Sequence, residues 1–124
     1  MTTALWCVLA AALLPIVCTA IAKLGAGPFD NRHPREWLAR LHGWRSRANA
    51  AQQNSWEALA IFAAGVFSAH LAHAPQPMVD LLALLFIGVR VIYVGCYLAD
   101  AASLRSLVWF AGLGLSIALF VAGA

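Results

Sequence analysis

The sequence predicts an all-α integral membrane protein, an up-down bundle of four transmembrane helices that forms a single domain over residues 1–124. The first indication is composition, because 63% of the residues are hydrophobic and only 10% are charged, whereas an average soluble domain has about 25% charged residues. The second indication is that the chain has four long stretches with almost no charged residues. The third indication is that only short connections separate the last three of these stretches. A soluble domain of this length cannot bury so much apolar surface, so soluble, disordered and coiled-coil proteins are excluded.

Each expected helix is close to the length of about 20 residues that spans a bilayer. Residues 1–22 contain no charged side chain, and Gly25 begins the segment that ends the first helix. The stretch 58–79 contains no Asp, Glu, Lys or Arg, and Pro75 lies in a very short turn that separates two antiparallel neighbours. The four helices are expected at about 3–24, 47–72, 78–99 and 104–122.

Positive charge is concentrated on one side of the predicted bundle. Arg105 flanks the last turn on that side, and the turn 73–77 on the other side has no Lys or Arg. The positive-inside rule therefore predicts that loop 25–46 is cytoplasmic and that both termini lie on the opposite side. Six of the eight basic residues lie in or beside this loop: Lys23, Arg32, Arg35, Arg40, Arg45 and Arg47.

The net charge of +3 follows from this topology, so no nucleic-acid partner is expected. Within the basic loop, Pro34 and Trp37 indicate a short amphipathic helix at the membrane surface. Alanine-rich helices and the short chain favour a bacterial inner membrane protein.

The second expected helix carries polar side chains at membrane depth, where a charged group costs roughly 2.5–3.5 kcal/mol on insertion scales. Arg47, Asn54 and Glu57 fall within about 80° of one another around the helix, and Gln53 lies beside them. They form one polar stripe on the half of the helix nearer the basic loop. The stripe fades toward Gly65, a small residue that suits close contact between helices.

The third expected helix carries a second polar stripe, because Arg90, Tyr93 and Tyr97 are spaced three and four residues apart. Arg105 and Ser106 follow at the start of the fourth helix. All of these groups lie in the half of the bundle nearer the basic loop. Together the two stripes predict a wet, cationic, aromatic-edged cavity whose natural ligand is a small anion with hydrogen-bonding groups.

Structural roles also explain these residues without any ligand. Glu57 and Arg90 are able to neutralise each other as a pair that holds the bundle together. Tyr93, Tyr97 and Arg105 are residue types that anchor helix ends at the membrane interface. Their shared face and depth favour a common site over separate structural roles.

Three pieces of the sequence resemble the MAPEG family, the membrane-associated proteins in eicosanoid and glutathione metabolism. They are the Asn-x-x-Glu pattern within 47–58, the Arg-x-x-Tyr-x-x-x-Tyr pattern of 90–97, and Leu-Arg-Ser at 104–106. The resemblance covers about residues 44–120 well and the first helix only by position and length. It implies a homotrimer of four-helix protomers, with glutathione bound between neighbouring subunits on the cytoplasmic side.

The resemblance also implies roles for individual residues. Arg105 would be catalytic, because it matches the arginine with which some members stabilise the glutathione thiolate. Asn54 and Glu57 match positions that contact or support glutathione, and Gln52 matches a polar contact in some members. The residues of the third helix match positions that line the same pocket. The candidate residues for binding glutathione or substrate are Arg47, Gln52, Gln53, Asn54, Glu57, Arg90, Tyr93, Tyr97 and Ser106.

The implied function is a glutathione-dependent transferase or peroxidase that acts on a lipophilic electrophile or hydroperoxide from the bilayer, with glutathione as co-substrate. Ala50 stands where leukotriene-forming and prostaglandin-forming members carry a basic residue, and Trp109 stands where some relatives have a tyrosine. The expectation therefore does not extend to eicosanoid substrates.

Two other functions compete with this one. The first is a noncatalytic lipid-binding scaffold of the same fold, and the second is a small four-helix transporter. Proton-coupled drug transporters of this size carry an essential acid in the first span, whereas this chain has none before Lys23. His70 and His73 have no evident third ligand, and the three cysteines show no paired spacing, so no metal site is expected.

Overall fold

The computed structural model describes all of residues 1–124, and its regular elements are all α-helices. α1, α4 and α5 are each long and apolar enough to cross a membrane. α3 has 29 residues but is not among these three, because the polar side chains of its first half lower its hydropathy. The helices are α1 (Thr3–Lys23), α2 (Pro34–Ala39), α3 (Gly43–Leu71), α4 (Gln76–Leu98) and α5 (Ala102–Ala122).

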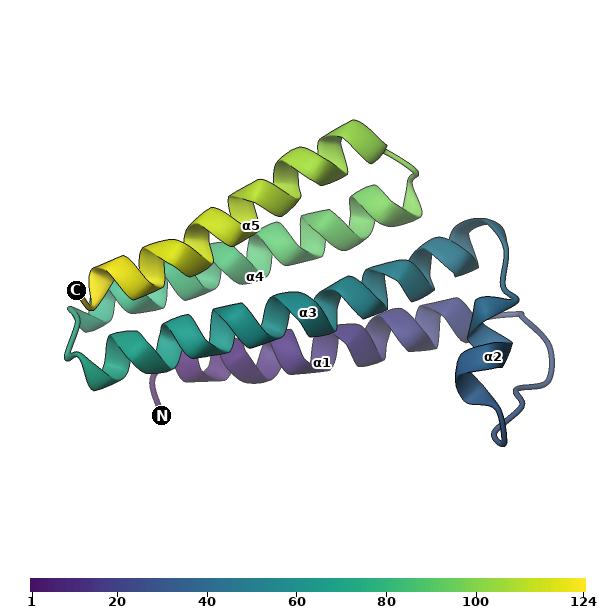
Figure 1. The fold of residues 1–124 in the computed structure, drawn as a ribbon, viewed down its shortest axis with the longest axis horizontal. Helices are drawn as coiled ribbons and strands as arrows, with labels where there is room; N and C mark the ends of the chain where they lie inside the picture. Colours follow the sequence, from purple (N-terminus) through teal and green to yellow (C-terminus); the bar gives the residue numbers. More distant parts are fainter.

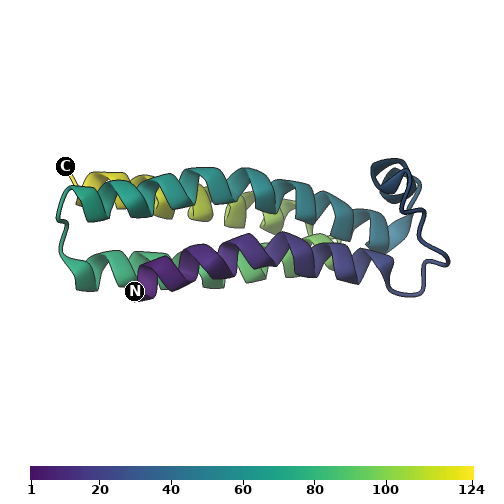
Figure 2. The ribbon, with the colours of Figure 1, turned by 90° about the horizontal axis from the view of Figure 1, so that it is seen from below.

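The four long helices pack as two pairs. Figure 1 shows α1 beside α3 and α4 beside α5, and Figure 2 shows α3 and α5 in one layer with α1 and α4 in the other. The α4–α5 pair diverges from α3 toward the end of the bundle where α2 lies (Figure 1). Both chain termini and the α3–α4 turn lie at the opposite end.

Local sequence explains where the helices begin and end. The Thr2 hydroxyl caps α1 by accepting the Leu5 N–H at 3.3 Å, and α2 begins at Pro34, whose fixed φ suits the first helical position. Gly25 after α1 and Asp100 after α4 have φ values of 64° and 58°. Both residues are in the left-handed conformation that commonly ends a helix.

The basic segment 25–46 is not wholly a loop, because it contains α2 and the first turn of α3. α3 begins at Gly43 rather than near residue 47. Trp37 fastens α2 to the preceding turn, since its indole N–H donates to the Pro28 carbonyl at 2.8 Å. The same indole meets the Phe29 ring edge-on, with ring centroids 5.1 Å apart.

The core of the bundle combines one aromatic pair with many small side chains. Phe62 of α3 and Phe86 of α4 are buried and stack with centroids 3.9 Å apart. A Cβ at Gly65 would lie 3.0 Å from the Ser116 carbonyl oxygen and 3.1 Å from Leu119 Cβ. The prediction that Gly65 suits close helix contact is therefore confirmed, because only glycine allows α5 to approach α3 this closely.

Hydrogen bonds tie the start of α1 to the ends of α3 and α4. The Ala4 N–H donates to the Asp80 carboxylate at 2.8 Å, and the Thr2 hydroxyl lies 2.9 Å from His70 Nε2. His70 Nδ1 donates to the Val66 carbonyl at 2.8 Å. Both ring nitrogens of His70 are therefore engaged within the protein.

Candidate functional site

Aromatic and cationic side chains form a column along α4 and α5, starting at the turn between them. The Arg105 guanidinium lies over the Tyr97 ring, 4.3 Å from its centroid. Tyr97 in turn meets Tyr93 edge-on at 5.5 Å, and the Arg90 guanidinium lies 4.1 Å from the Tyr93 centroid. The column therefore has one cation, Arg105, near the end of α4 and a second, Arg90, deeper in the bundle. Arg90 lies about 12 Å from Leu98, the last residue of α4, at 1.5 Å per residue.

The column continues onto α3 through hydrogen bonds. Arg90 Nη2 donates to Asn54 Oδ1 at 2.9 Å and to the Ser55 hydroxyl at 3.4 Å. The Asn54 amide then donates to Glu57 Oε2 at 3.3 Å. We call the six residues joined in this way the polar line: Arg105, Tyr97, Tyr93, Arg90, Asn54 and Glu57.

Arg90 is a buried cation without an ion pair. Its side chain is only 3% exposed, and the single ion pair in the structure joins His33 and Asp30 in the loop. Glu57 is exposed and is linked to Arg90 only through the Asn54 amide, so the direct pair considered from the sequence does not form. Both protein hydrogen bonds of Arg90 come from Nη2, which leaves Nε and Nη1 without a protein acceptor. Burying a charge without a bonded anion is costly, so this site is suited to an anionic or oxygen-bearing ligand.

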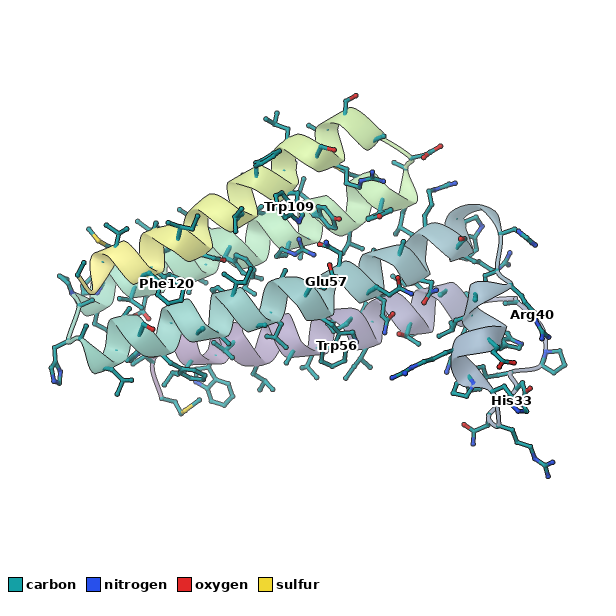
Figure 3. All side chains as sticks on the ribbon, viewed as in Figure 1. His33, Arg40, Trp56, Glu57, Trp109 and Phe120 are labelled. Carbon is teal, nitrogen blue, oxygen red and sulfur yellow. The ribbon has the colours of Figure 1, made fainter.

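A pocket of about 400 Å³, open space at its mouth included, lies between α3 and α5, with α4 behind it. Figure 3 shows Glu57 and Trp109 on facing sides of this space, whereas Trp56 lies on the opposite side of α3. Asn54, Glu57 and Arg90 make one end of the pocket polar. The remaining lining residues are Ala58, Ile61, Phe86, Trp109, Gly112, Leu113 and Ser116.

Four predicted site residues do not join the polar line. Arg47 Nη2 donates to the Leu98 carbonyl at 3.2 Å, and its Nε is buried without a partner. Gln52 and Gln53 line a separate groove between α2 and α3, because the turn of α3 carries them away from Asn54. Ser106 is exposed, and its hydroxyl donates to a carbonyl of its own helix at 3.2 Å.

Several residues in or beside the pocket were not expected from the sequence. Ser55 was not predicted, yet its hydroxyl accepts a hydrogen bond from Arg90. Trp109 lines the pocket, whereas the sequence singled it out only because some relatives have a tyrosine at that position. Gly112 and Ser116 are four residues apart on α5, a spacing of small residues that marks close helix contact. That spacing is the one signal by which the α5 side of the pocket could have been found.

In the loop, Asp30 holds the turn before α2. Its Oδ1 accepts the Arg32 backbone N–H at 2.9 Å, and its Oδ2 lies 3.2 Å from His33 Nδ1. The Arg32 bond first, and then the His33 contact, lower the pKa of the Asp30 carboxyl from its usual value. This group is exposed and stands apart from the polar line, so its role is local.

Comparison with known proteins gave one match. A family model described as the MAPEG family matches residues 3–124, nearly the whole chain. The match includes the first helix, which the sequence resemblance covers only by position and length. No curated protein and no solved structure was similar enough to count as a match.

Proposed function

The chain belongs to the MAPEG family, and from this premise we propose that it is a glutathione-dependent transferase or peroxidase of the membrane. Its apolar helices and its family make it an integral membrane protein. The observation that supports the proposed activity most is Arg90, buried without an ion pair at the centre of the polar line. Glutathione carries carboxylates and a thiolate, which are the groups that such a cationic line would hold.

Arg105 would stabilise the thiolate of bound glutathione. A charge-assisted hydrogen bond contributes roughly 1.5–3 kcal/mol, and one unit of pKa corresponds to about 1.4 kcal/mol. One bond from Arg105 would therefore lower the pKa of the glutathione thiol by about one to two units. Arginine suits this role because it keeps its own charge, and the Tyr97 ring beneath it at 4.3 Å would hold the guanidinium in place.

The thiolate supports two reactions. With an electrophile, sulfur forms a bond to carbon, and the leaving group departs with the electron pair of the broken bond. With a hydroperoxide, sulfur attacks oxygen and the O–O bond breaks, so that the alkoxide takes a proton and becomes an alcohol. The sulfenic acid formed on the first glutathione then condenses with a second glutathione to give the disulfide and water.

We also propose the placement of the chain in the membrane. α3 would be a fourth spanning helix, because its 29 residues exceed the length needed and it packs along α1. The basic segment 25–46 would face the cytoplasm and both termini the opposite side, with α2 at the headgroups. The protein would be a homotrimer in a bacterial inner membrane.

Turnover as a function of pH tests the function. We expect purified protein to conjugate glutathione to 1-chloro-2,4-dinitrobenzene or to reduce cumene hydroperoxide. Arg105→Ala should lower the rate at neutral pH about 10- to 100-fold and shift the pH profile upward by about one to two units. Leu107→Ala, on an outward face that is 67% exposed, should leave both unchanged.

Two results would contradict the proposal. An Arg105→Ala protein as fast as the wild type would show that the thiolate mechanism is wrong. A folded wild type that turns over neither substrate would favour the noncatalytic lipid-binding scaffold instead.

A further inference from the structure

The groove between α2 and α3 is lined by polar side chains that do not belong to the polar line. We propose that this groove binds the headgroup of an anionic phospholipid that carries hydroxyls, with Arg35 on the phosphate and the carboxamides of α3 on the hydroxyls. The inference goes beyond the proposed function, because it rests on the proposed placement of α2 at the headgroups and not on glutathione turnover. The lining residues are Arg35 and Leu38 of α2 and Asn49, Gln52, Gln53 and Trp56 of α3.

The polar side chains of the groove have no partners within the protein. The Arg35 guanidinium forms no ion pair, because the single ion pair of the structure joins His33 and Asp30, and no Asp or Glu lines the groove. The three carboxamides form no hydrogen bond within the protein, whereas Arg47 and Asn54 on other faces of α3 are both bonded to protein atoms. One guanidinium and three carboxamides therefore present their donors and acceptors to a molecule that enters the groove.

The chemistry of this lining indicates the class of ligand. A guanidinium is planar, keeps its charge and binds two phosphate oxygens at once. A carboxamide both donates and accepts hydrogen bonds without adding charge, which suits a hydroxyl group. The groove therefore matches a ligand with one negative charge and several hydroxyls, such as the phosphate diester of phosphatidylglycerol. Glutathione matches it less well, because its ammonium group finds no carboxylate there.

The polar stripe of the groove ends on an indole at greater membrane depth. Asn49, Gln53 and Trp56 are spaced four and three residues apart, so they lie on one face of α3. Trp56 is 46% exposed and lies about 10 Å along the helix from Asn49 at 1.5 Å per residue, on the opposite side of α3 from Glu57 (Figure 3). Exposed indoles are enriched where headgroups meet acyl chains. This order of side chains suits a whole lipid, since a free phosphate ester would use only the polar part.

The segment around the groove adds electrostatic attraction. Segment 25–46 contains four arginines and two acidic residues, and basic side chains attract an anionic membrane surface within about 10 Å. Arg45 is engaged within the fold, because its Nε donates to the Leu24 carbonyl at 2.7 Å. Arg32 and Arg35 are both exposed, but only Arg35 lines the groove. Arg32 is therefore a matched control for the charge of Arg35.

Lipid binding to the full chain in detergent tests the inference. The protein is titrated with phosphatidylglycerol and with two comparison lipids, and native mass spectrometry measures the lipid bound per protomer. Phosphatidylmethanol keeps the charged diester without hydroxyls, and phosphatidylcholine carries a choline cation that cancels the charge. The wild type should bind phosphatidylglycerol about tenfold more tightly than phosphatidylcholine, and about threefold more tightly than phosphatidylmethanol.

Two pairs of variants at exposed positions locate the binding. Arg35→Gln should weaken phosphatidylglycerol binding about tenfold, whereas Arg32→Gln should leave it unchanged. Gln53→Leu should abolish the preference over phosphatidylmethanol, whereas Asn31→Leu, which removes an exposed loop amide outside the groove, should keep it. Equal losses in the two arginine variants would assign the binding to the general charge of the segment and overturn the inference.

Competition and assembly mass separate the lipid from other occupants of the groove. Millimolar glycerol 1-phosphate or glutathione should not displace phosphatidylglycerol, and displacement by either would make the groove a site for a soluble anion. A changed oligomer mass in Arg35→Gln or Gln53→Leu would assign the groove to a contact between subunits. Either result would overturn the inference. Arg105→Ala should bind the lipid as the wild type does, so lipid binding without glutathione turnover would refute the proposed function and support this inference.

Discussion

Replacement of Arg90 by methionine distinguishes a ligand site from a structural ion pair. Removal of one partner of a buried ion pair destabilises a protein by about 3–5 kcal/mol. The structure shows no ion pair at Arg90, so the variant loses only the hydrogen bonds to Asn54 and Ser55 and the contact with the Tyr93 ring. Methionine has a similar length and no charge, so it should fill the same space.

The expected change in stability is small because the contributions oppose each other. The 2.9 Å charge-assisted bond to Asn54 contributes roughly 1.5–3 kcal/mol, and the ring contact with Tyr93 about 0.5–2 kcal/mol. Against this, removal of the buried guanidinium eliminates a desolvation penalty of several kcal/mol. The free energy of unfolding should therefore change by no more than about 2 kcal/mol in either direction, whereas glutathione binding should weaken at least tenfold.

Thermal unfolding in detergent, followed by circular dichroism, measures the first quantity. For a chain of this size, 1 kcal/mol corresponds to about 3–5 °C in Tm, so the shift should stay below about 10 °C. Glutathione titration of the same preparation measures the second quantity. A Tm drop of 15 °C or more with glutathione binding intact would show instead that Arg90 is a structural residue.

Three further predictions concern packing, the column and the loop. Gly65→Ala should destabilise the protein by about 1–3 kcal/mol, because its Cβ would lie 3.0 Å from a backbone oxygen. Gly88→Ala, whose Cβ would have nothing within 4 Å, should not lower the Tm. The reverse order of Tm values in thermal melts would contradict the packing of α3 against α5. Tyr97→Leu should slow glutathione turnover about fivefold, because the Arg105 guanidinium loses the ring that it lies on. Tyr97→Phe keeps the ring and should retain the rate. An equal loss of rate in both variants would assign the role of Tyr97 to its hydroxyl. The pKa of Asp30 is lowered in the folded chain, so the stabilisation that its carboxylate gives the loop is present at neutral pH and is lost as the pH falls through the lowered pKa. In the wild type, amide exchange in the loop should become faster over this fall in pH. The same pH-dependent change in Asp30→Ala would contradict the prediction.

The polar line was largely predictable because it follows helical periodicity. Spacings of three and four residues on one rigid helix must bring Arg90, Tyr93 and Tyr97 onto one face, and the structure stacks them there. The same periodicity places Asn54 and Glu57 together on α3. Periodicity does not specify how one helix is rotated and shifted against the next. For that reason periodicity did not reveal that Gln52 and Gln53 line a groove between α2 and α3, apart from the polar line.

The apolar end of the pocket was not predictable in the same way. Trp109 and Leu113 are ordinary residues for an apolar helix, and the spacing of Gly112 and Ser116 indicates close helix contact without indicating a cavity. Their role depends on how closely α5 approaches α3. Gly65 permits a close approach at one end, and at the other end the α4–α5 pair diverges from α3 (Figure 1). Such geometry comes from packing between helices and is visible only in three dimensions.

Isothermal titration of glutathione into the detergent-purified protein tests directly whether the polar line is a glutathione site. We predict saturable binding at one site per protomer, weakened at least tenfold in Arg90→Met and Arg105→Ala and unchanged in Leu107→Ala. Absence of binding at millimolar glutathione by a folded wild type would contradict it. That result would mean that the chain has kept the fold of its family without the glutathione chemistry.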